Sequence, residues 1–99
     1  MQKRFEGKVV VLTGSSSGIG YSSALRFGRE GATVFISSRK KASVNKAVAA
    51  LKKEGIDAYG MACHVGKPEQ RKNFVKFVKE KAGRIDILSL NAGAGFYFG

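Results

Sequence analysis

A glycine-rich turn between an apolar segment and a helical segment carries the strongest chemical signal in the chain. The apolar run Val9–Leu12 is followed by Gly14, Gly18 and Gly20 in the pattern Gly-x-x-x-Gly-x-Gly. Glycines let the backbone bend and approach a ligand, and a helix that starts there directs its free N–H groups at an anion. The turn therefore predicts a site for the diphosphate of a nucleotide. The residues expected to form it are Gly14, Ser16, Ser17, Gly18, Ile19 and Gly20.

The spacing of this turn separates it from two related phosphate-binding patterns. It departs from the Gly-x-Gly-x-x-Gly dinucleotide fingerprint. It also lacks the Gly-Lys-Ser/Thr ending of a P-loop, because Gly20 is followed by Tyr21 and Ser22. A site that hydrolyses a nucleoside triphosphate is therefore not expected.

A second polar segment follows the apolar run Thr33–Ile36 and bears on the choice of cofactor. In a dinucleotide site the residue at the end of the second strand contacts the adenosine ribose. An acid there binds the 2′-hydroxyl of NAD, and an arginine accommodates the 2′-phosphate of NADP. Ser37, Ser38, Arg39 and Lys40 occupy the corresponding positions, and none is an acid. This favours NADP(H), because Arg39 can form a bidentate contact with phosphate and Lys40 can add a charge. The alternative is that Arg39 and Lys40 only begin a basic surface helix.

The elements that must position these residues alternate between strand and helix. Three apolar runs are typical of strands, Val9–Leu12, Thr33–Ile36 and Ile85–Leu90. A fourth candidate strand, the less apolar segment Ala58–Val65, lies between the second and third helical segments. Between these four segments, helical spacing covers Gly18–Glu30, Ala42–Glu54 and a segment from Pro68 to just before Gly83. The apolar positions expected in the core are Ala24, Leu25, Phe27, Val44, Ala47, Val48, Leu51, Phe74, Val75, Phe77 and Val78.

This βαβαβαβ pattern predicts an α/β fold with a Rossmann-like, doubly wound parallel sheet. The expected strand order is 3-2-1-4, and the chain is expected to stop after the fourth strand. Ligand should bind outside the carboxyl ends of the strands. The glycine-rich turn and the segment Asn91–Gly93 both follow such ends, so the fold predicts that they converge.

Composition limits the remaining function classes. With 99 residues and 43% hydrophobic content, the chain has the size of one small globular domain. The net charge of +11 could indicate nucleic-acid binding. Most of that charge lies on or beside two predicted helices and no nucleic-acid module accompanies it, so solvated helix faces are the favoured interpretation.

Other single features point to an intracellular protein without a metal centre. Cys63 is the only cysteine, so no intrachain disulfide and no cysteine metal cluster can form, and a buried structural thiol is expected. No apolar run reaches membrane-spanning length, and only a few residues precede the first strand, which leaves no room for a signal peptide.

Two motifs together resemble the short-chain dehydrogenase/reductase family. Thr13–Gly20 has the form Thr-Gly-x-x-x-Gly-Ile-Gly, and Asn91, Ala92 and Gly93 match the Asn-Ala-Gly motif that lies beside the cofactor in this family. The resemblance implies an oxidoreductase that uses a nicotinamide cofactor. Members are more than twice as long, so it also implies that residues 1–99 are the N-terminal part of a single dinucleotide-binding domain.

Within the family, three segments resemble a branch of NADP-dependent retinal and carbonyl reductases. They are Ser37–Lys40, Cys63–Lys67 and Asn91–Gly99. This resemblance implies reduction of ketones, aldehydes or retinal by a cytoplasmic or peroxisomal homotetramer. The end of the third strand departs from the family pattern, with His64-Val65 in place of Asp-Val. His64 and Val65 are expected near the adenine, the alternative being a strand-end histidine without function.

The residues that perform the chemistry in this family are not found in the chain. The family uses a downstream Ser, a Tyr-x-x-x-Lys pair and a further Asn. Tyr21 and Tyr59 are followed four positions later by Leu25 and Cys63, and the matching position for Tyr97 falls beyond residue 99. No catalytic residue is assigned, and we expect these 99 residues alone to be inactive and marginally stable or prone to aggregation.

Three residues near the end and two further function classes stay open at this point. Phe96, Tyr97 and Phe98 could line the mouth of a substrate pocket or pack against other polypeptide. A non-catalytic nucleotide-binding module and a basic nucleic-acid-binding domain are the alternatives to the oxidoreductase.

Overall fold

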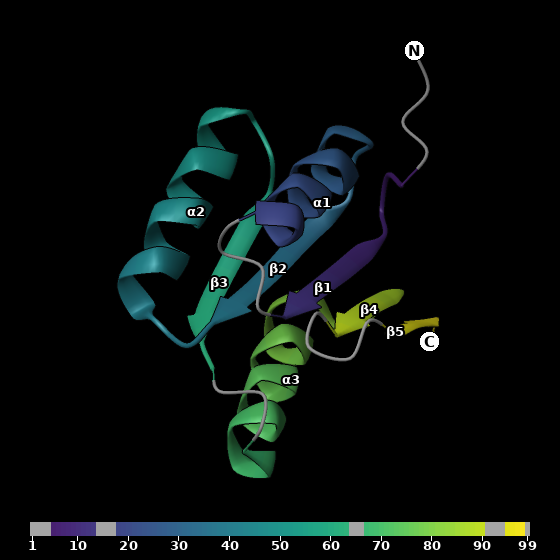
Figure 1. Cartoon of the computed structure of the whole chain (residues 1–99). Helices are drawn as coiled ribbons and strands as arrows, with labels where there is room; N and C mark the ends of the chain where they lie inside the picture. The colour runs from purple at the N-terminus through teal and green to yellow at the C-terminus, as the bar shows by residue number, and fades with distance from the viewer. Residues whose placement is uncertain (1–4, 14–17, 64–66, 91–94, 99) are drawn as a thin grey trace.

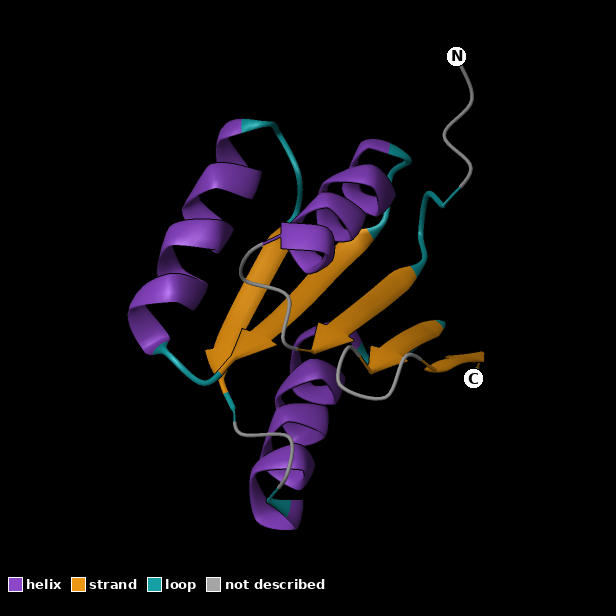
Figure 2. Cartoon of the chain, in the orientation of Figure 1, coloured by secondary structure: helices purple, strands orange, loops and turns teal. Residues whose placement is uncertain are grey.

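The computed structural model describes residues 5–13, 18–63, 67–90 and 95–98, which form one sheet flanked by helices (Figures 1 and 2). The strands are β1 (Val9–Thr13), β2 (Thr33–Ser38), β3 (Ala58–Ala62), β4 (Ile87–Leu90) and β5 (Gly95–Phe98). The helices are α1 (Gly18–Arg29), α2 (Lys41–Lys53) and α3 (Pro68–Ala82).

The first four strands are parallel and follow the predicted order. The sheet reads β3-β2-β1-β4-β5, so the prediction of a doubly wound α/β fold with the order 3-2-1-4 is confirmed. Val9 pairs with Thr33 at one end of β1, and Thr13 pairs with both Ser37 and Leu90 at the other end. The carboxyl ends of β1, β2 and β4 therefore lie at one edge of the sheet.

The prediction that the sheet ends at the fourth strand was wrong. Gly95–Phe98 forms β5, which pairs antiparallel with β4 from Leu90↔Gly95 to Ile87↔Phe98. Only four residues separate the two strands, which suffices for an antiparallel return, whereas a parallel partner needs a crossover of about a dozen residues. The aromatic run 96–98 has high strand propensity. A mixed sheet with one antiparallel edge strand results.

The sheet separates two apolar cores, one for each face. Val10, Leu12 and Ile36 point to the face covered by α1 and α2, where they pack with Ala24 and Leu51. On the other face, Val9, Val11 and Phe35 pack with Phe74 and Val78 of α3. Side chains alternate along a strand, so strands that are apolar at every position fit only a sheet covered on both sides. The helices of Figure 1 provide this cover.

The predicted core positions on the helices are confirmed except for Val75. Ala24, Val44, Ala47, Leu51, Phe74 and Val78 are buried. Leu25, Phe27, Val48 and Phe77 pack against the two cores while partly exposed. Val75 is half-buried, and it lines a groove instead.

Glycines end the helices as the sequence predicted. The residues that follow α1, α2 and α3 include Gly31, Gly55 and Gly83, with φ angles of 97°, 81° and 76°. The Gly83 N–H donates to the Lys79 carbonyl at 2.9 Å. A left-handed residue at this position favours glycine and satisfies a carbonyl of the last helical turn.

Two strand limits differ from the sequence prediction. β3 ends at Ala62 and not at Val65, and β4 begins at Ile87 and not at Ile85. Just before β4, the Asp86 N–H donates to the Val9 carbonyl, and the Asp86 carboxylate accepts the Val9 N–H. Regular pairing between β1 and β4 therefore begins after Asp86.

Candidate nucleotide-binding site

The start of helix α1 lies just beyond the carboxyl end of β1. Thr13 ends the strand and is buried, and α1 begins at Gly18, so Gly18, Ile19 and Gly20 form the first helical turn. The first N–H groups of a helix have no partner within it, and the helix dipole adds positive potential at this end. The first turn of α1 contains no acidic residue, so nothing in it opposes an anion.

Part of the predicted turn lies outside the described residues. Gly14, Ser16 and Ser17 belong to this part, and for Gly18, Ile19 and Gly20 only the helical backbone is described. The loop is bounded by Thr13 on one side and by the α1 N-terminus on the other. The predicted position between a buried strand and a helix start is therefore present.

The end of β2 brings a serine and two cations to the same edge. Ser38 is half-buried, whereas Arg39 and Lys40 are exposed. Lys40 is the N-cap of α2 with extended backbone, and its N–H donates to the Ser38 Oγ at 3.4 Å. The first turn of α2 also has no acidic residue. All the side chains placed here can donate hydrogen bonds, and two are positively charged, which is the donor set that a phosphate requires.

Strand pairing brings the Asn-Ala-Gly segment toward the glycine-rich turn. Asn91, Ala92 and Gly93 lie outside the described residues. However, Leu90, the residue before Asn91, pairs with Thr13, the residue before Gly14. The two motifs, far apart in the sequence, thus leave neighbouring strands at the same edge, as the fold predicted.

The end of β3 approaches the same edge through Cys63. Its N–H donates to the Ser38 carbonyl at 2.8 Å, while its Sγ contacts the Gln70 carbonyl oxygen at 3.3 Å. The side chain is 3% exposed, and burial raises the pKa of the thiol although Arg71 acts in the opposite direction. The prediction of a buried structural thiol is confirmed. His64 and Val65 follow directly and lie outside the described residues.

Two tyrosines, Tyr21 and Tyr59, pack within the fold. Tyr21 packs against the core beneath α1. Tyr59 stacks on Phe35, with ring centroids 4.9 Å apart. Of Tyr97 only the strand backbone is described.

The burial of Ser37 at this edge was not predicted from the sequence. Ser37 is completely buried, and its Oγ has no hydrogen-bond partner among the described residues. It pairs with Thr13 in β1 and Met61 in β3. Ser38, Arg39 and Lys40 follow it directly in the sequence. Alternation along β2 from the core residue Phe35 was the available signal, because it places Ser37 on the α3 face of the sheet.

The fold and this edge define a class of protein. A doubly wound sheet whose glycine-rich turn and cationic strand end share the carboxyl edge is the arrangement of dinucleotide-binding α/β proteins. The family model for short chain dehydrogenase matches residues 8–97, and the chain belongs to this family of oxidoreductases.

Similar proteins from plants and animals support the same assignment. The chain is 51% identical over 94 residues to the short-chain dehydrogenase/reductase SDRA of Arabidopsis thaliana, covering 95% of this chain and 37% of that protein. It is 45% identical over 92 residues to dehydrogenase/reductase SDR family member 4 of Homo sapiens, covering 93% of this chain and 33% of that protein. The latter belongs to the branch that the sequence resembles. The chain thus spans about a third of the length of these relatives.

A solved structure shares the fold. The F189W variant of actinorhodin polyketide ketoreductase, solved with NADPH, superimposes with a TM-score of 0.84 at 32% identity, covering 92% of this chain and 34% of that one. No helix in the described part of the chain combines the length and apolar character needed to cross a bilayer.

Proposed function

We propose that residues 1–99 are the NADP(H)-binding, N-terminal part of a single dinucleotide-binding domain in an oxidoreductase that reduces carbonyl compounds. The observation that carries the proposal is the pair Arg39 and Lys40. Both are exposed directly after β2, at the edge where β1 leads into α1. The ketoreductase of similar fold was solved with NADPH, which supports the same class of cofactor here.

Each part of the edge has a role in this proposal. The turn Gly14–Gly20 and the α1 N-terminus hold the diphosphate, and no acidic side chain in the first turn of α1 repels it. The Arg39 guanidinium forms a bidentate contact with the 2′-phosphate, while Ser38 and Lys40 donate beside it. His64 and Val65 lie near the adenine, and Asn91, Ala92 and Gly93 line the cofactor from the end of β4.

The bound cofactor would supply the hydride for reduction of a ketone, an aldehyde or retinal. The residues assigned here bind and orient it, and none is assigned a proton-transfer role. A cytoplasmic or peroxisomal location and a homotetramer, both implied by the family branch, stay predictions.

The distribution of charge supports this proposal over nucleic-acid binding. Lys46 and Lys53 lie on α2, whereas Lys72 and Lys79 lie on α3. These helices cover opposite faces of the sheet. The basic residues are therefore divided, and a duplex would need them gathered on one surface.

Binding of two small probes tests the cofactor preference. Adenosine 2′,5′-bisphosphate carries the 2′-phosphate that distinguishes NADP from NAD, and AMP does not. We expect the first to bind at least about tenfold more tightly, since a charged hydrogen bond contributes about 1.5–3 kcal/mol. Arg39→Asp should remove this preference. Arg26→Asp makes the same charge change in the last turn of α1 and should preserve it. Equal affinities for the two probes, or an unchanged preference in Arg39→Asp, would refute the assignment.

A chimera tests the reaction and the alternative of a non-catalytic module. Residues 1–99 replace the matching segment of the Arabidopsis relative, and consumption of NADPH is followed with a ketone, an aldehyde and retinal. We expect turnover of at least one of these. A folded chimera that binds NADPH but reduces none of them would favour the non-catalytic module.

A further inference from the structure

The first turn of α2 carries a serine close to the cationic segment that follows β2. Ser43 is half-buried in this turn, whereas Arg39 and Lys40 before it are exposed. The connection from β2 to α2 is short (Figure 1), so the three residues lie together at the carboxyl edge of the sheet. The proposed function gives Arg39 and Lys40 a role and leaves Ser43 without one.

The residues before Ser43 are basic in a pattern that no other hydroxyl residue of the chain shares. Lys41 and Lys40 stand two and three positions before it in the sequence. At every other serine and threonine, the residues at these two positions are uncharged or acidic. Protein kinases distinguish among possible substrates by such charge patterns. The pattern therefore singles out Ser43 for a kinase that prefers basic residues at these positions.

The structure places Ser43 where an acidic side chain can cap the helix. Lys40 is the N-cap of α2 without a side-chain cap hydrogen bond, and the helix begins at Lys41, so Ser43 is its third residue. At this position the glutamate of a capping box accepts the N–H of the N-cap residue. Here the Lys40 N–H donates to the Ser38 Oγ over a long 3.4 Å. A phosphate on Ser43 would supply the missing acidic acceptor.

The charges around this turn favour an anionic side chain. No acidic residue lies in the first turn of α2, and the amino end of a helix carries positive potential. The first N–H groups of a helix have no partner within it, and the Val44 N–H is the one that bonds to the Lys40 carbonyl, at 3.1 Å. A phosphate on Ser43 is attached covalently, so the helix end and the two cations only need to orient it.

We propose that Ser43 is a phosphorylation site whose phosphate competes with the 2′-phosphate of NADP(H) for Arg39 and Lys40. The competition rests on the proposed function, whereas the modification does not. The phosphoserine accepts the Lys40 N–H and pairs with the Arg39 guanidinium. Its charge of nearly two negative units repels a second phosphate at the same place. Phosphorylation thus weakens binding of the phosphorylated cofactor.

The reaction uses ATP and a protein kinase as its co-reactants. The Ser43 Oγ attacks the γ-phosphorus of ATP, and the bond from that phosphorus to the β,γ-bridging oxygen breaks, so that ADP leaves. The hydroxyl proton passes to the catalytic aspartate of the kinase. Helix ends fray, and α2 starts without a side-chain cap, so its first turn can open to present the hydroxyl.

Treatment of the whole chain with ATP and the cyclic-AMP-dependent protein kinase tests the modification. Mass spectrometry should find one phosphate, on Ser43, and Ser43→Ala should acquire none. Lys41→Gln removes a basic residue before the serine and should slow the reaction. Lys46→Gln makes the same change three positions after the serine and should leave the rate unchanged.

Calorimetric binding of adenosine 2′,5′-bisphosphate and AMP tests the competition. Phosphorylation should weaken binding of the first at least about tenfold, because its charged hydrogen bonds are lost. AMP lacks the 2′-phosphate and should lose much less. Ser43→Glu serves if the modified chain fails to fold, and it should lower the preference for the bisphosphate. Ala49→Glu adds the same charge at an exposed position of α2 and should preserve the preference.

Phosphorus NMR tests the contact with the cations without any nucleotide. A free phosphoserine has a second pKa of about 6, and pairing with Arg39 and Lys40 should lower this pKa in the folded chain relative to the same chain in urea. This measurement separates the two proposals. If the unmodified chain binds both nucleotides equally, the cofactor assignment and the competition fail together, while the modification of Ser43 and its lowered pKa still stand or fall by themselves.

Three outcomes would overturn the inference. The first is equal labelling of Ser43→Ala and the unaltered chain, or no labelling of either. The second is a phosphorylated chain that keeps its full preference for the bisphosphate over AMP. The third is the same phosphoserine pKa in the folded chain and in urea.

Discussion

The carboxylate of Asp86 accepts the backbone N–H of Val9 at 2.8 Å, while the Asp86 N–H donates to the Val9 carbonyl at 2.9 Å. These reciprocal bonds join residues 77 positions apart at the amino end of the sheet. Regular pairing follows at once, from Val10↔Ile87 to Thr13↔Leu90. The contact between Asp86 and Val9 therefore lies at the start of the register that brings Leu90 beside Thr13 at the carboxyl edge of the sheet.

Acid should weaken this contact, and Asp86→Asn should remove the pH dependence that it causes. The Arg84 guanidinium beside Asp86, together with the Val9 N–H, holds the pKa of that carboxyl below its ordinary value. A depressed folded-state pKa stabilises the protein above the unfolded value of about 3.9, and the stabilisation is lost as the pH falls through the folded value. We expect Asp86→Asn to cost about 1–2 kcal/mol at neutral pH and progressively less below about pH 4.

Urea unfolding of both proteins between neutral and strongly acid pH measures this difference. Asp57→Asn provides a control at an exposed carboxyl that bonds the Thr33 hydroxyl at 3.1 Å. A constant gap between wild type and Asp86→Asn at every pH would contradict the assignment.

Gly28→Ala should destabilise the protein although alanine favours helices. A Cβ at Gly28 would lie 2.4 Å from Cγ2 of Ile56 and within 2.8 Å of two more of its side-chain carbons, so the whole Ile56 side chain would have to move. Overpacking costs about 1–3 kcal/mol, which exceeds the gain of about 1 kcal/mol in helix propensity. The measurement is the free energy of unfolding.

A second substitution checks the cause of the Gly28 effect. Ile56→Ala removes the clashing atoms, so Gly28→Ala should be neutral or stabilising in that background. A loss of the same size in both backgrounds would mean that Ile56 is not the neighbour responsible.

Cys63 should react slowly with iodoacetamide in the folded protein. Burial raises the pKa of its thiol, and alkylation requires an accessible thiolate. We expect the rate near neutral pH to be at least about tenfold lower than in urea, where the unfolded thiol has a pKa of about 8.5. Equal rates in the two conditions would show that the side chain is open to solvent.

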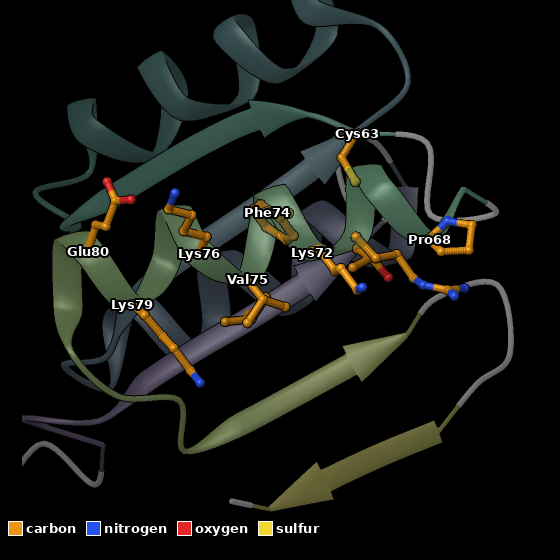
Figure 3. A pocket seen from close by; sticks show the side chains of 11 residues that line it. Cys63, Pro68, Lys72, Phe74, Val75, Lys76, Lys79 and Glu80 are labelled. Carbon is orange, nitrogen blue, oxygen red and sulfur yellow. The ribbon is translucent and has the colours of Figure 1, made fainter.

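The 99-residue chain should also be only marginally stable or prone to aggregation by itself. A groove along α3 (Figure 3) is lined by apolar side chains such as Val75, which no second helix among the described residues covers, and such surfaces promote association. Sedimentation and thermal unfolding measure this. A soluble monomer with a cooperative unfolding transition would contradict the expectation.

Sequence patterns predicted most of the fold because local physics controls them. Val9–Leu12 is apolar at every position, which only a strand buried on both faces explains, and it lies within β1. Pro68 begins α3 and Gly83 follows its end with a positive φ, both as predicted. The antiparallel strand β5 was missed because the aromatic run Phe96–Phe98 fits a strand or a pocket lining equally well, and its pairing partner is not encoded locally.

The sequence by itself indicated the family and the residues proposed to bind a dinucleotide, and the tertiary structure decided how the segments that carry these residues are arranged. Glycine spacing, Arg39 and the Asn-Ala-Gly motif indicate a dinucleotide and a family because they depend on residue types a few positions apart. The register that places Leu90 beside Thr13, the burial of Ser37 and the groove along α3 depend on residues distant in the chain. Such contacts form only when all the elements pack together, so no local pattern specifies them.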